Sequence, residues 1–241
     1  MAAAVGLEKV RAVAGEGLVP AYEAARVSLE KAGLAGQRAA VYLVLDRSGS
    51  MRPYYRDGSV QRLAEQVLAL SAHLDDDGVV PVVFFSTGVD GVADLSLGDY
   101  RGRIEALHAS YGHMGRTNYH VGMQAVLDHH AASGAERPAF VVFQTDGGPT
   151  LRSAAEQLLC YSARLPVFWQ FIGFGDPDDK QFAFLRRLDD LPVPERRVVD
   201  NAGFFPAGST PGAWTDGQLY DALTAEFPGW LAAARAAGVL G

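Results

Sequence analysis

The segment Val41-Tyr42-Leu43-Val44-Leu45-Asp46-Arg47-Ser48-Gly49-Ser50-Met51 sets an apolar run directly before an acid and two hydroxyl side chains at alternate positions. Five consecutive apolar residues rich in valine and leucine are typical of a strand buried on both faces, as in the centre of a parallel sheet. Asp46 then stands at the carboxyl end of that strand. In open α/β sheets, ligands bind at the carboxyl ends of strands, near the point where the strand order reverses. We therefore expect Asp46, Ser48 and Ser50 to face a binding crevice.

Further apolar runs alternate with helical patterns along the rest of the chain. The runs over 79–85, 139–143 and 166–174 predict buried strands, and shorter strands are expected over 92–95 and 197–200. Apolar residues at spacings of three and four predict the helices between them. This alternation indicates βαβ units. We therefore expect an α/β fold with a doubly wound, mainly parallel sheet of about six strands, flanked by helices on both faces.

Two segments in the second half of the chain give local expectations. Ser153 and Glu156 have the spacing of a capping box, which predicts the start of a helix. That helix carries apolar residues at helical spacing: Ala154, Leu158, Tyr161 and Leu165. A loop rich in Gly, Pro and Ser is expected over 201–213, followed by a closing helix from about Asp216 with a kink at Pro228.

The chain divides into a short amino-terminal segment and one larger domain. Residues 1–38 are rich in Ala and Gly, and Leu18, Tyr22 and Leu29 suggest short helical pieces. Because this segment is too short to bury a core of its own, we expect an arm packed on the main domain, which spans 39–241.

Composition excludes several classes of function. The chain has 241 residues, a net charge of −7 and a pI near 5.3, so attraction to nucleic acid or to an anionic membrane surface is not expected. Cys160 is the single cysteine and cannot form an internal disulfide. The sequence shows no secretory signal and no apolar run near the roughly 20 residues that cross a bilayer. These features predict a cytoplasmic protein without membrane insertion.

The acid and the two hydroxyls of the first segment, followed by methionine, resemble the metal-ion-dependent adhesion site (MIDAS) of von Willebrand factor A (vWA) domains. That family completes its site with a threonine from a second loop and an aspartate from a third. These match the threonine of Gly115-Arg116-Thr117-Asn118 and the aspartate of Thr145-Asp146-Gly147. The resemblance covers about 39–235 and implies a Rossmann-like vWA fold. The expected metal-binding residues are Asp46, Ser48, Ser50, Thr117 and Asp146.

The chemistry of this ligand set favours a hard cation. Carboxylate and hydroxyl oxygens suit Mg²⁺ better than zinc, with Ca²⁺ and Mn²⁺ as alternatives. The two carboxylates roughly balance the charge of the ion. The resemblance implies that the three hydroxyls touch the metal, that Asp46 and Asp146 act largely through bound water, and that one open coordination position accepts an acidic oxygen from a protein partner.

Other interpretations of these residues stay open or are less favoured. The metal ligand expected from Thr117 could instead come from Ser110, Asn118 or Thr145. His113 and His120 could bind a softer metal, but no cysteine or close carboxylate completes such a set. The acidic turns over 75–77 and 176–179 lack the glycine and the terminal glutamate of a calcium loop. The sequence contains no phosphate-binding loop, no dinucleotide fingerprint and no nucleophile elbow.

Three segments, 41–51, 145–150 and 199–205, look like the TerF-type vWA domain of bacterial tellurium-resistance (toxic cation stress) systems. Members of that group often carry a TerD-like domain ahead of the vWA domain, and here about 38 residues precede the first strand, so a separate TerD-like protein is a candidate partner. The resemblance implies a non-enzymatic, metal-dependent protein-binding module in a metal-stress complex. An adaptor for an ATPase is one alternative. A metal-dependent phosphatase or phosphotransferase is another, although Ser48 stands where such enzymes usually need a second aspartate.

Overall fold

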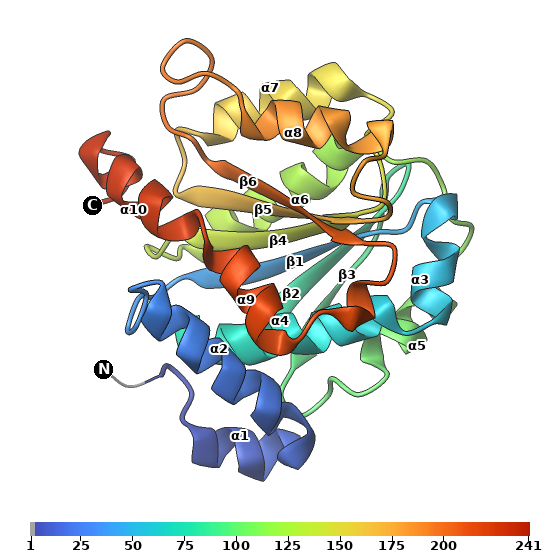
Figure 1. Ribbon diagram of the computed structural model, residues 1–241, viewed down its shortest axis with the longest axis vertical. Coiled ribbons are helices and arrows are strands. Elements are labelled where there is room, and N and C mark those ends of the chain that lie inside the picture. Colours follow the sequence, from blue (N-terminus) through green and yellow to red (C-terminus); the bar gives the residue numbers. More distant parts are fainter. Residues whose placement is uncertain (1–2) are drawn as a thin grey trace.

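A computed structural model describes residues 3–241 of the chain (Figure 1). The described residues form one six-stranded sheet in the order β3-β2-β1-β4-β5-β6, in which all neighbours are parallel except β2 and β3. The strands are β1 (Ala40–Asp46), β2 (Val79–Phe85), β3 (Val89–Ser96), β4 (Ala139–Thr145), β5 (Val167–Phe174) and β6 (Ala202–Gly208). The predicted α/β, doubly wound, mainly parallel sheet is confirmed.

Helices cover both faces of the sheet, and each face has its own hydrophobic cluster (Figure 1). The α-helices are α1 (Leu7–Ala14), α2 (Val19–Lys31), α3 (Arg52–Arg56), α4 (Ser59–Leu74), α5 (Arg103–Ser110), α6 (Tyr119–Ser133), α7 (Arg152–Ser162), α8 (Ala183–Asp189), α9 (Asp216–Thr224) and α10 (Phe227–Ala236). Short 3₁₀ turns are η1 (Glu16–Leu18), η2 (Gly49–Met51), η3 (Lys180–Phe182) and η4 (Pro211–Ala213). One face packs against α6, α7 and α8, and the other against α2, α4, α9 and α10.

The strand order places the reversal point beside β1. From β1 the chain moves to β2 and β3 on one side, and then crosses to β4, β5 and β6 on the other. Asp46 and Thr145 are the last residues of the adjacent strands β1 and β4, and both are buried. The reversal of strand order therefore puts the carboxyl ends of β1 and β4 at the position where open α/β sheets bind ligands.

The predicted last strand was placed in the wrong segment. Residues 197–200 form a loop in which the guanidinium of Arg197 pairs with Asp200 at 2.8 Å, whereas β6 lies in the segment 201–213 that was expected to be a loop. Its sequence contains Gly203 and Pro206, which normally argue against a strand. Because β6 is the edge strand, it hydrogen-bonds only to β5, and a proline is tolerated there.

The capping box expected at Ser153 and Glu156 is also wrong. Helix α7 starts two residues earlier, with Leu151 rather than Ser153 as its N-cap; no side chain caps it, and Glu156 instead pairs with Arg187 and Arg196. The buried face of α7 is shifted by one residue from the predicted one and consists of Ala155, Leu159 and Ser162. Tyr161 is 60% exposed. The buried Ser162 hydroxyl accepts from Trp169 of β5, and the Leu159 carbonyl accepts from Asn201, so this face of α7 lies against the sheet.

The two ends of the chain lie on the same side of the sheet (Figure 1). Helix α2 packs against α4 and α9, and the Tyr22 hydroxyl donates to the Val5 carbonyl at 2.9 Å. At the carboxyl end the expected kink at Pro228 is a break between α9 and α10, and Pro228 lies in the first turn of α10, where a missing N–H is tolerated.

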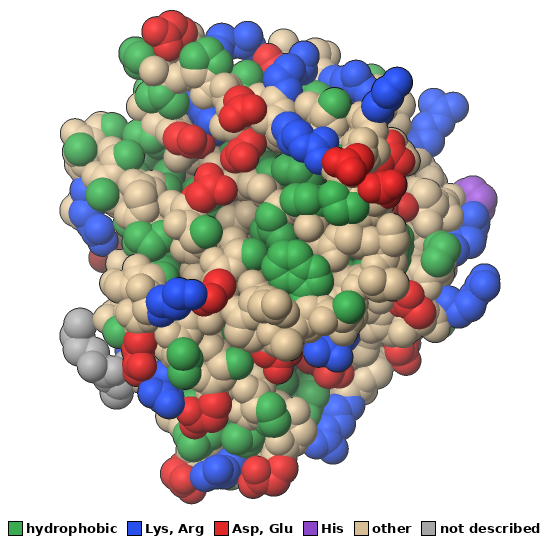
Figure 2. Space-filling view, in the orientation of Figure 1, with side chains coloured by type: hydrophobic (Ala, Val, Ile, Leu, Met, Phe, Trp, Pro, Cys, Tyr) green, Lys and Arg blue, Asp and Glu red, His purple; other side chains and the backbone are tan. Residues whose placement is uncertain are grey.

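The surface and the helices bear on how the chain meets its surroundings. Within residues 3–241, no helix combines the length and the apolar character needed to cross a membrane. On the face shown in Figure 2, basic side chains are interspersed with acidic ones rather than gathered into a single patch.

Candidate metal centre

The three loops expected to form the site meet at the carboxyl ends of β1 and β4. The amide of Gly49 donates to the carbonyl of Gly115 at 3.2 Å, which joins the loop after β1 to the loop before α6. The amide of Thr150 donates to the carbonyl of Thr117 at 2.7 Å, which joins the loop before α6 to the loop after β4. Segments that are 66 and 33 positions apart in sequence are thus held together by backbone hydrogen bonds.

Four of the five predicted residues form one chain of polar contacts. The hydroxyls of Ser48 and Ser50 lie 3.2 Å apart, and the Ser50 hydroxyl donates to Asp146 Oδ1 at 2.9 Å. Asp46 lies beneath them, fully buried: its Oδ1 accepts from the Ser48 amide at 2.6 Å and its Oδ2 from the Thr145 hydroxyl at 2.7 Å. Ser50 is exposed, so the polar chain runs from a buried acid to the surface.

Thr117, the fifth predicted residue, is half-buried, and its hydroxyl makes no hydrogen bond within residues 3–241. Two of the three alternatives are engaged elsewhere: the Ser110 hydroxyl donates to the Leu107 carbonyl, and the Thr145 hydroxyl donates to Asp46. The Asn118 side-chain nitrogen donates to the Thr87 carbonyl, whereas Asn118 Oδ1 is buried and has no hydrogen-bond partner within residues 3–241. Metal binding through Thr117 stays a prediction, but its hydroxyl is available for it.

The electrostatics of the site fit a divalent cation. Within residues 3–241, neither Asp46 nor Asp146 has an ion-pair partner. Burial, with the nearby Asp146 carboxylate, raises the pKa of Asp46 to about 7, and burial raises the pKa of Asp146 as well. Two close carboxylates without a counter-charge are unfavourable when both are ionised, and a bound cation removes that cost.

The donor types point to the same class of ion. The described residues contain no group of three or more His, Cys, Asp and Glu that could hold a metal. A cation at this site would therefore be held by two carboxylates and by hydroxyls, which suits Mg²⁺, Mn²⁺ or Ca²⁺ better than zinc. Such an ion would supply positive charge and open coordination positions to an approaching anionic group.

A second set of polar residues beside the site was not predicted from sequence. Arg47 lies between Asp46 and Ser48 in the chain, and its side chain is 1% exposed. Its guanidinium donates to Asp90 at 2.7 Å and to His108 Nδ1 at 3.1 Å. The sequence offers one signal for it, since alternation along the extended segment sends the arginine to the side opposite its two neighbours.

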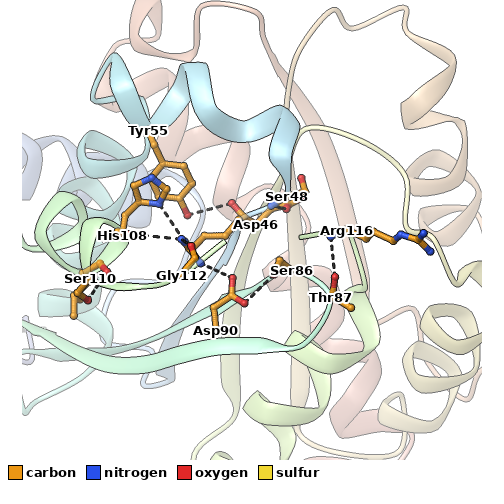
Figure 3. A network of polar contacts seen from close by, with 12 residues as sticks. Asp46, Ser48, Tyr55, Ser86, Thr87, Asp90, His108, Ser110, Gly112 and Arg116 are labelled. Carbon is orange, nitrogen blue, oxygen red and sulfur yellow. Dashed lines mark hydrogen bonds and ion pairs between the residues drawn. The ribbon is translucent and has the colours of Figure 1, made fainter. Parts of the chain in front are cut away.

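Tyr55 links this set to the metal loop. Its ring stacks on His108 with 4.0 Å between centroids, and its hydroxyl donates to the Asp46 carbonyl at 3.1 Å (Figure 3). Burial and the neighbouring Arg47 lower the pKa of His108, so the imidazole favours the neutral form. A neutral ring can accept the hydrogen bond from the guanidinium while it stacks on tyrosine.

A groove of about 290 Å³ opens beside the candidate site. Ser50 and Asp146 line it, and its apolar lining includes the rings of Tyr54 and Phe174, whose centroids are 5.3 Å apart. Three more carboxylates line the groove, those of Asp57, Asp176 and Asp179. None of these three forms an ion pair within residues 3–241. Among the residues that the structure describes, the lining of the groove therefore carries four carboxylates and no basic side chain.

Comparisons with known proteins place the chain in a family. A family described as "vWA found in TerF C terminus" matches residues 38–240. The uncharacterised protein YcbR of Bacillus subtilis (strain 168) is 36% identical over 219 residues, which cover 89% of this chain and 86% of that protein.

Solved structures support the fold alone, because their identities to this chain are low. Proximal thread matrix protein 1 from the mussel byssus is 16% identical with a TM-score of 0.54, covering 79% of this chain and 47% of its own. A von Willebrand factor type A protein from Catenulispora acidiphila is 17% identical with a TM-score of 0.52, covering 79% and 42%. The manganese-loaded TRAP protein of Plasmodium vivax is 16% identical with a TM-score of 0.50, covering 78% and 75%. The chain spans about half the length of the first two. With a family match over residues 38–240 and the predicted sheet in place, the chain belongs to the vWA family of the type found at the TerF C terminus.

Proposed function

We propose that this chain is a non-enzymatic protein-binding module that recognises its partner through a divalent cation, with Mg²⁺ as the preferred ion. The observation that carries the proposal is the pair Asp46 and Asp146, two buried or half-buried carboxylates without a counter-charge, joined by the hydroxyls of Ser48 and Ser50. With Thr117 these residues would hold the cation. Mn²⁺ and Ca²⁺ are the alternatives, and the fold relative from Plasmodium vivax is described as manganese-loaded.

The environment of Asp46 supports binding rather than catalysis. Aspartyl-phosphate enzymes need an exposed aspartate that can attack a phosphoryl group, with a second acid nearby to move a proton. Asp46 is 0% exposed, and both of its oxygens accept hydrogen bonds. Ser48 occupies the position of the second acid, so the residues of a phosphotransferase are incomplete.

The groove adds a requirement on the partner. A carboxylate that approaches the cation also approaches Asp57, Asp176 and Asp179, which repel it. A partner segment whose acidic residue is accompanied by lysine or arginine meets both the cation and these carboxylates. A TerD-like protein in a tellurium-resistance or metal-stress complex, inside the cytoplasm, is the partner that the family suggests.

Mg²⁺ titration followed by calorimetry and by thermal unfolding tests the proposal. Mg²⁺ at about 100 times its dissociation constant should raise the free energy of unfolding by about 2.7 kcal/mol. Thr117→Ala and Asp146→Ala should remove most of this gain. Ser110→Ala is the matched control, since it deletes a hydroxyl outside the site and should leave the gain unchanged.

Partner binding needs its own measurement. Affinity capture from a lysate of the source cells, with Mg²⁺ against chelator, should yield a protein that is retained only with the metal and is lost with Thr117→Ala. Failure of Mg²⁺ to bind, or capture that is equal in chelator, contradicts the proposal. Phosphatase turnover that Asp46→Asn abolishes would favour the enzyme instead.

A further inference from the structure

We infer that Arg47 is a positioning residue that keeps the loop carrying Thr117 in register with the serines of the metal loop. The inference rests on the proposed metal site and adds to it a residue outside the expected ligand set. Its connection to Thr117 runs through Asp90 and the turn formed by Ser86 and Thr87, each step of which is a hydrogen bond in the structure.

The first step joins Arg47 to this turn. Asp90 accepts from the Arg47 guanidinium at 2.7 Å through Oδ2 and from the Ser86 hydroxyl at 2.8 Å through Oδ1 (Figure 3). One carboxylate therefore bridges the metal loop and the turn between β2 and β3. The guanidinium also donates to the Gly112 carbonyl at 3.0 Å, in the loop before α6.

The second step joins the turn to both neighbours of Thr117. The amide of Arg116 donates to the Thr87 hydroxyl at 3.0 Å (Figure 3). The amide of Asn118 donates to the Ser86 carbonyl at 3.0 Å. The Asn118 side chain donates to the Thr87 carbonyl at 2.8 Å. Thr117 is thus held by its backbone on both sides, which leaves its hydroxyl unused.

The burial of Arg47 explains why this arrangement is rigid. A buried guanidinium without partners is costly, so its donors must stay aligned with fixed acceptors. The planar guanidinium has its donors in a fixed geometry, and here they reach β3, α5 and the loop before α6. A shift of the loop before α6 relative to Ser48 would break the bond to Gly112, and a shift of β3 would break the bond to Asp90.

A double-mutant cycle tests the connection. Calorimetry measures the Mg²⁺ affinity with and without Arg47→Met, first in the natural chain and then in the Thr117→Ala variant. Residues that orient metal ligands typically contribute about 10-fold or more in affinity, so we expect Arg47→Met to weaken Mg²⁺ binding about 10-fold in the natural chain and less than about 2-fold in Thr117→Ala. Arg47→Lys should lie between, since it keeps the charge and loses the fork of donors.

Arg197→Met is the matched control. Arg197 has a side chain that is also 1% exposed and paired with a carboxylate, but it precedes β6 at the opposite end of the sheet. It should lower stability and leave Mg²⁺ affinity unchanged. Equal losses from Arg47→Met in both backgrounds, or a loss from Arg197→Met as large as that from Arg47→Met, would overturn the inference.

Hydrogen exchange in chelator separates this inference from the proposed function, because it needs no metal. Arg47→Met should speed exchange at the amides of Arg116 and Asn118 about 10-fold more than at amides of β5, whereas Arg197→Met should not. If Arg47→Met does not fold, Ser86→Ala takes its place and should have the same effect. If the natural chain binds no Mg²⁺, the proposed function fails and this measurement alone decides. Unchanged exchange at these two amides overturns the role of Arg47.

Discussion

The guanidinium of Arg47 lies 2.7 Å from the carboxylate of Asp90, and the arginine side chain is 1% exposed while that of the aspartate is 17% exposed. Breaking a buried pair by removing one partner costs about 3–5 kcal/mol, since it leaves the other charge uncompensated. Arg47→Met should lower the free energy of unfolding, measured with urea, by about 3 kcal/mol, the lower end of that range, because Asp90 keeps some contact with water.

The double variant Arg47→Met/Asp90→Asn is the control for this prediction. With no carboxylate left unpaired, it should be more stable than Arg47→Met alone. If the loss in free energy of unfolding in the double variant equals the sum of the losses in the two single variants, the ion pair does not account for the stability.

The pKa of Asp46, about 7 in the folded metal-free chain against an ordinary 3.8, predicts two opposite pH dependences. The folded chain binds a proton at Asp46 more tightly than the unfolded chain does. In chelator, the resulting contribution to the free energy of unfolding is therefore fully present below about pH 4 and is lost as pH rises through about 7. Mg²⁺ binding needs the ionised carboxylate, so the affinity should rise up to about 10-fold per pH unit below pH 7 and level off above it. Calorimetry and urea unfolding across pH 5 to 9 measure both.

Asp46→Asn is the control for the pH dependence of stability. Burial and Glu226 raise the pKa of Asp189 to about 7 as well, which gives a similar slope in both chains, so the difference between them isolates Asp46. A stability profile identical in the two chains would contradict the prediction.

Gly115 and Gly112 lie in the same loop and differ in the space around them. A Cβ on Gly115 would meet the Thr87 hydroxyl at 2.5 Å and the Thr87 amide at 3.0 Å, whereas nothing lies within 4 Å of one on Gly112. Gly115→Ala should push the Thr117 loop off the Ser86–Thr87 turn, and lower Mg²⁺ affinity about 10-fold. Gly112→Ala should change it less than about 2-fold, and equal effects of the two substitutions would disprove this assignment.

The acidic groove predicts selectivity among peptides. In the presence of Mg²⁺, a short peptide with one glutamate and a nearby lysine should bind more tightly than the same peptide with glutamine for lysine, by up to about 5-fold per exposed charge pair. Asp57→Asn and Asp176→Asn should each reduce this preference, and 0.5 M salt should largely remove it. Titrations followed by NMR chemical shifts measure this preference. Equal affinities of the two peptides in low salt would rule out the requirement for a basic residue in the partner.

Those parts of the fold that depend on local pattern could be predicted from sequence. Strands β1, β2, β4 and β5 consist mostly of apolar residues, and such runs are typical of strands buried on both faces of a sheet. Helix α4 follows from its spacing. The edge strand β6 could not be predicted, because an edge tolerates the glycine and proline that mark a loop elsewhere.

The site divides in the same way. Asp46, Ser48 and Ser50 were predictable as a group because they are adjacent in sequence at a strand end, and Asp146 because it follows a second buried strand. The set around Arg47 was not, because its partners Asp90, His108 and Gly112 come from β3 and the segment before α6. Their proximity is a property of the strand order.

The sequence by itself determined the buried strands β1, β2, β4 and β5, the order of the oxygen-bearing residues and the class of cation they suit, because hydrophobic periodicity and ligand chemistry are local. The tertiary structure decided that the three loops meet, that Asp46 is buried while Ser50 is exposed, and that Arg47 points away from the metal loop toward the Thr117 loop. These relations come from packing and hydrogen bonds between residues about 40 to 100 positions apart, whose free energy is gained only when the whole sheet is assembled.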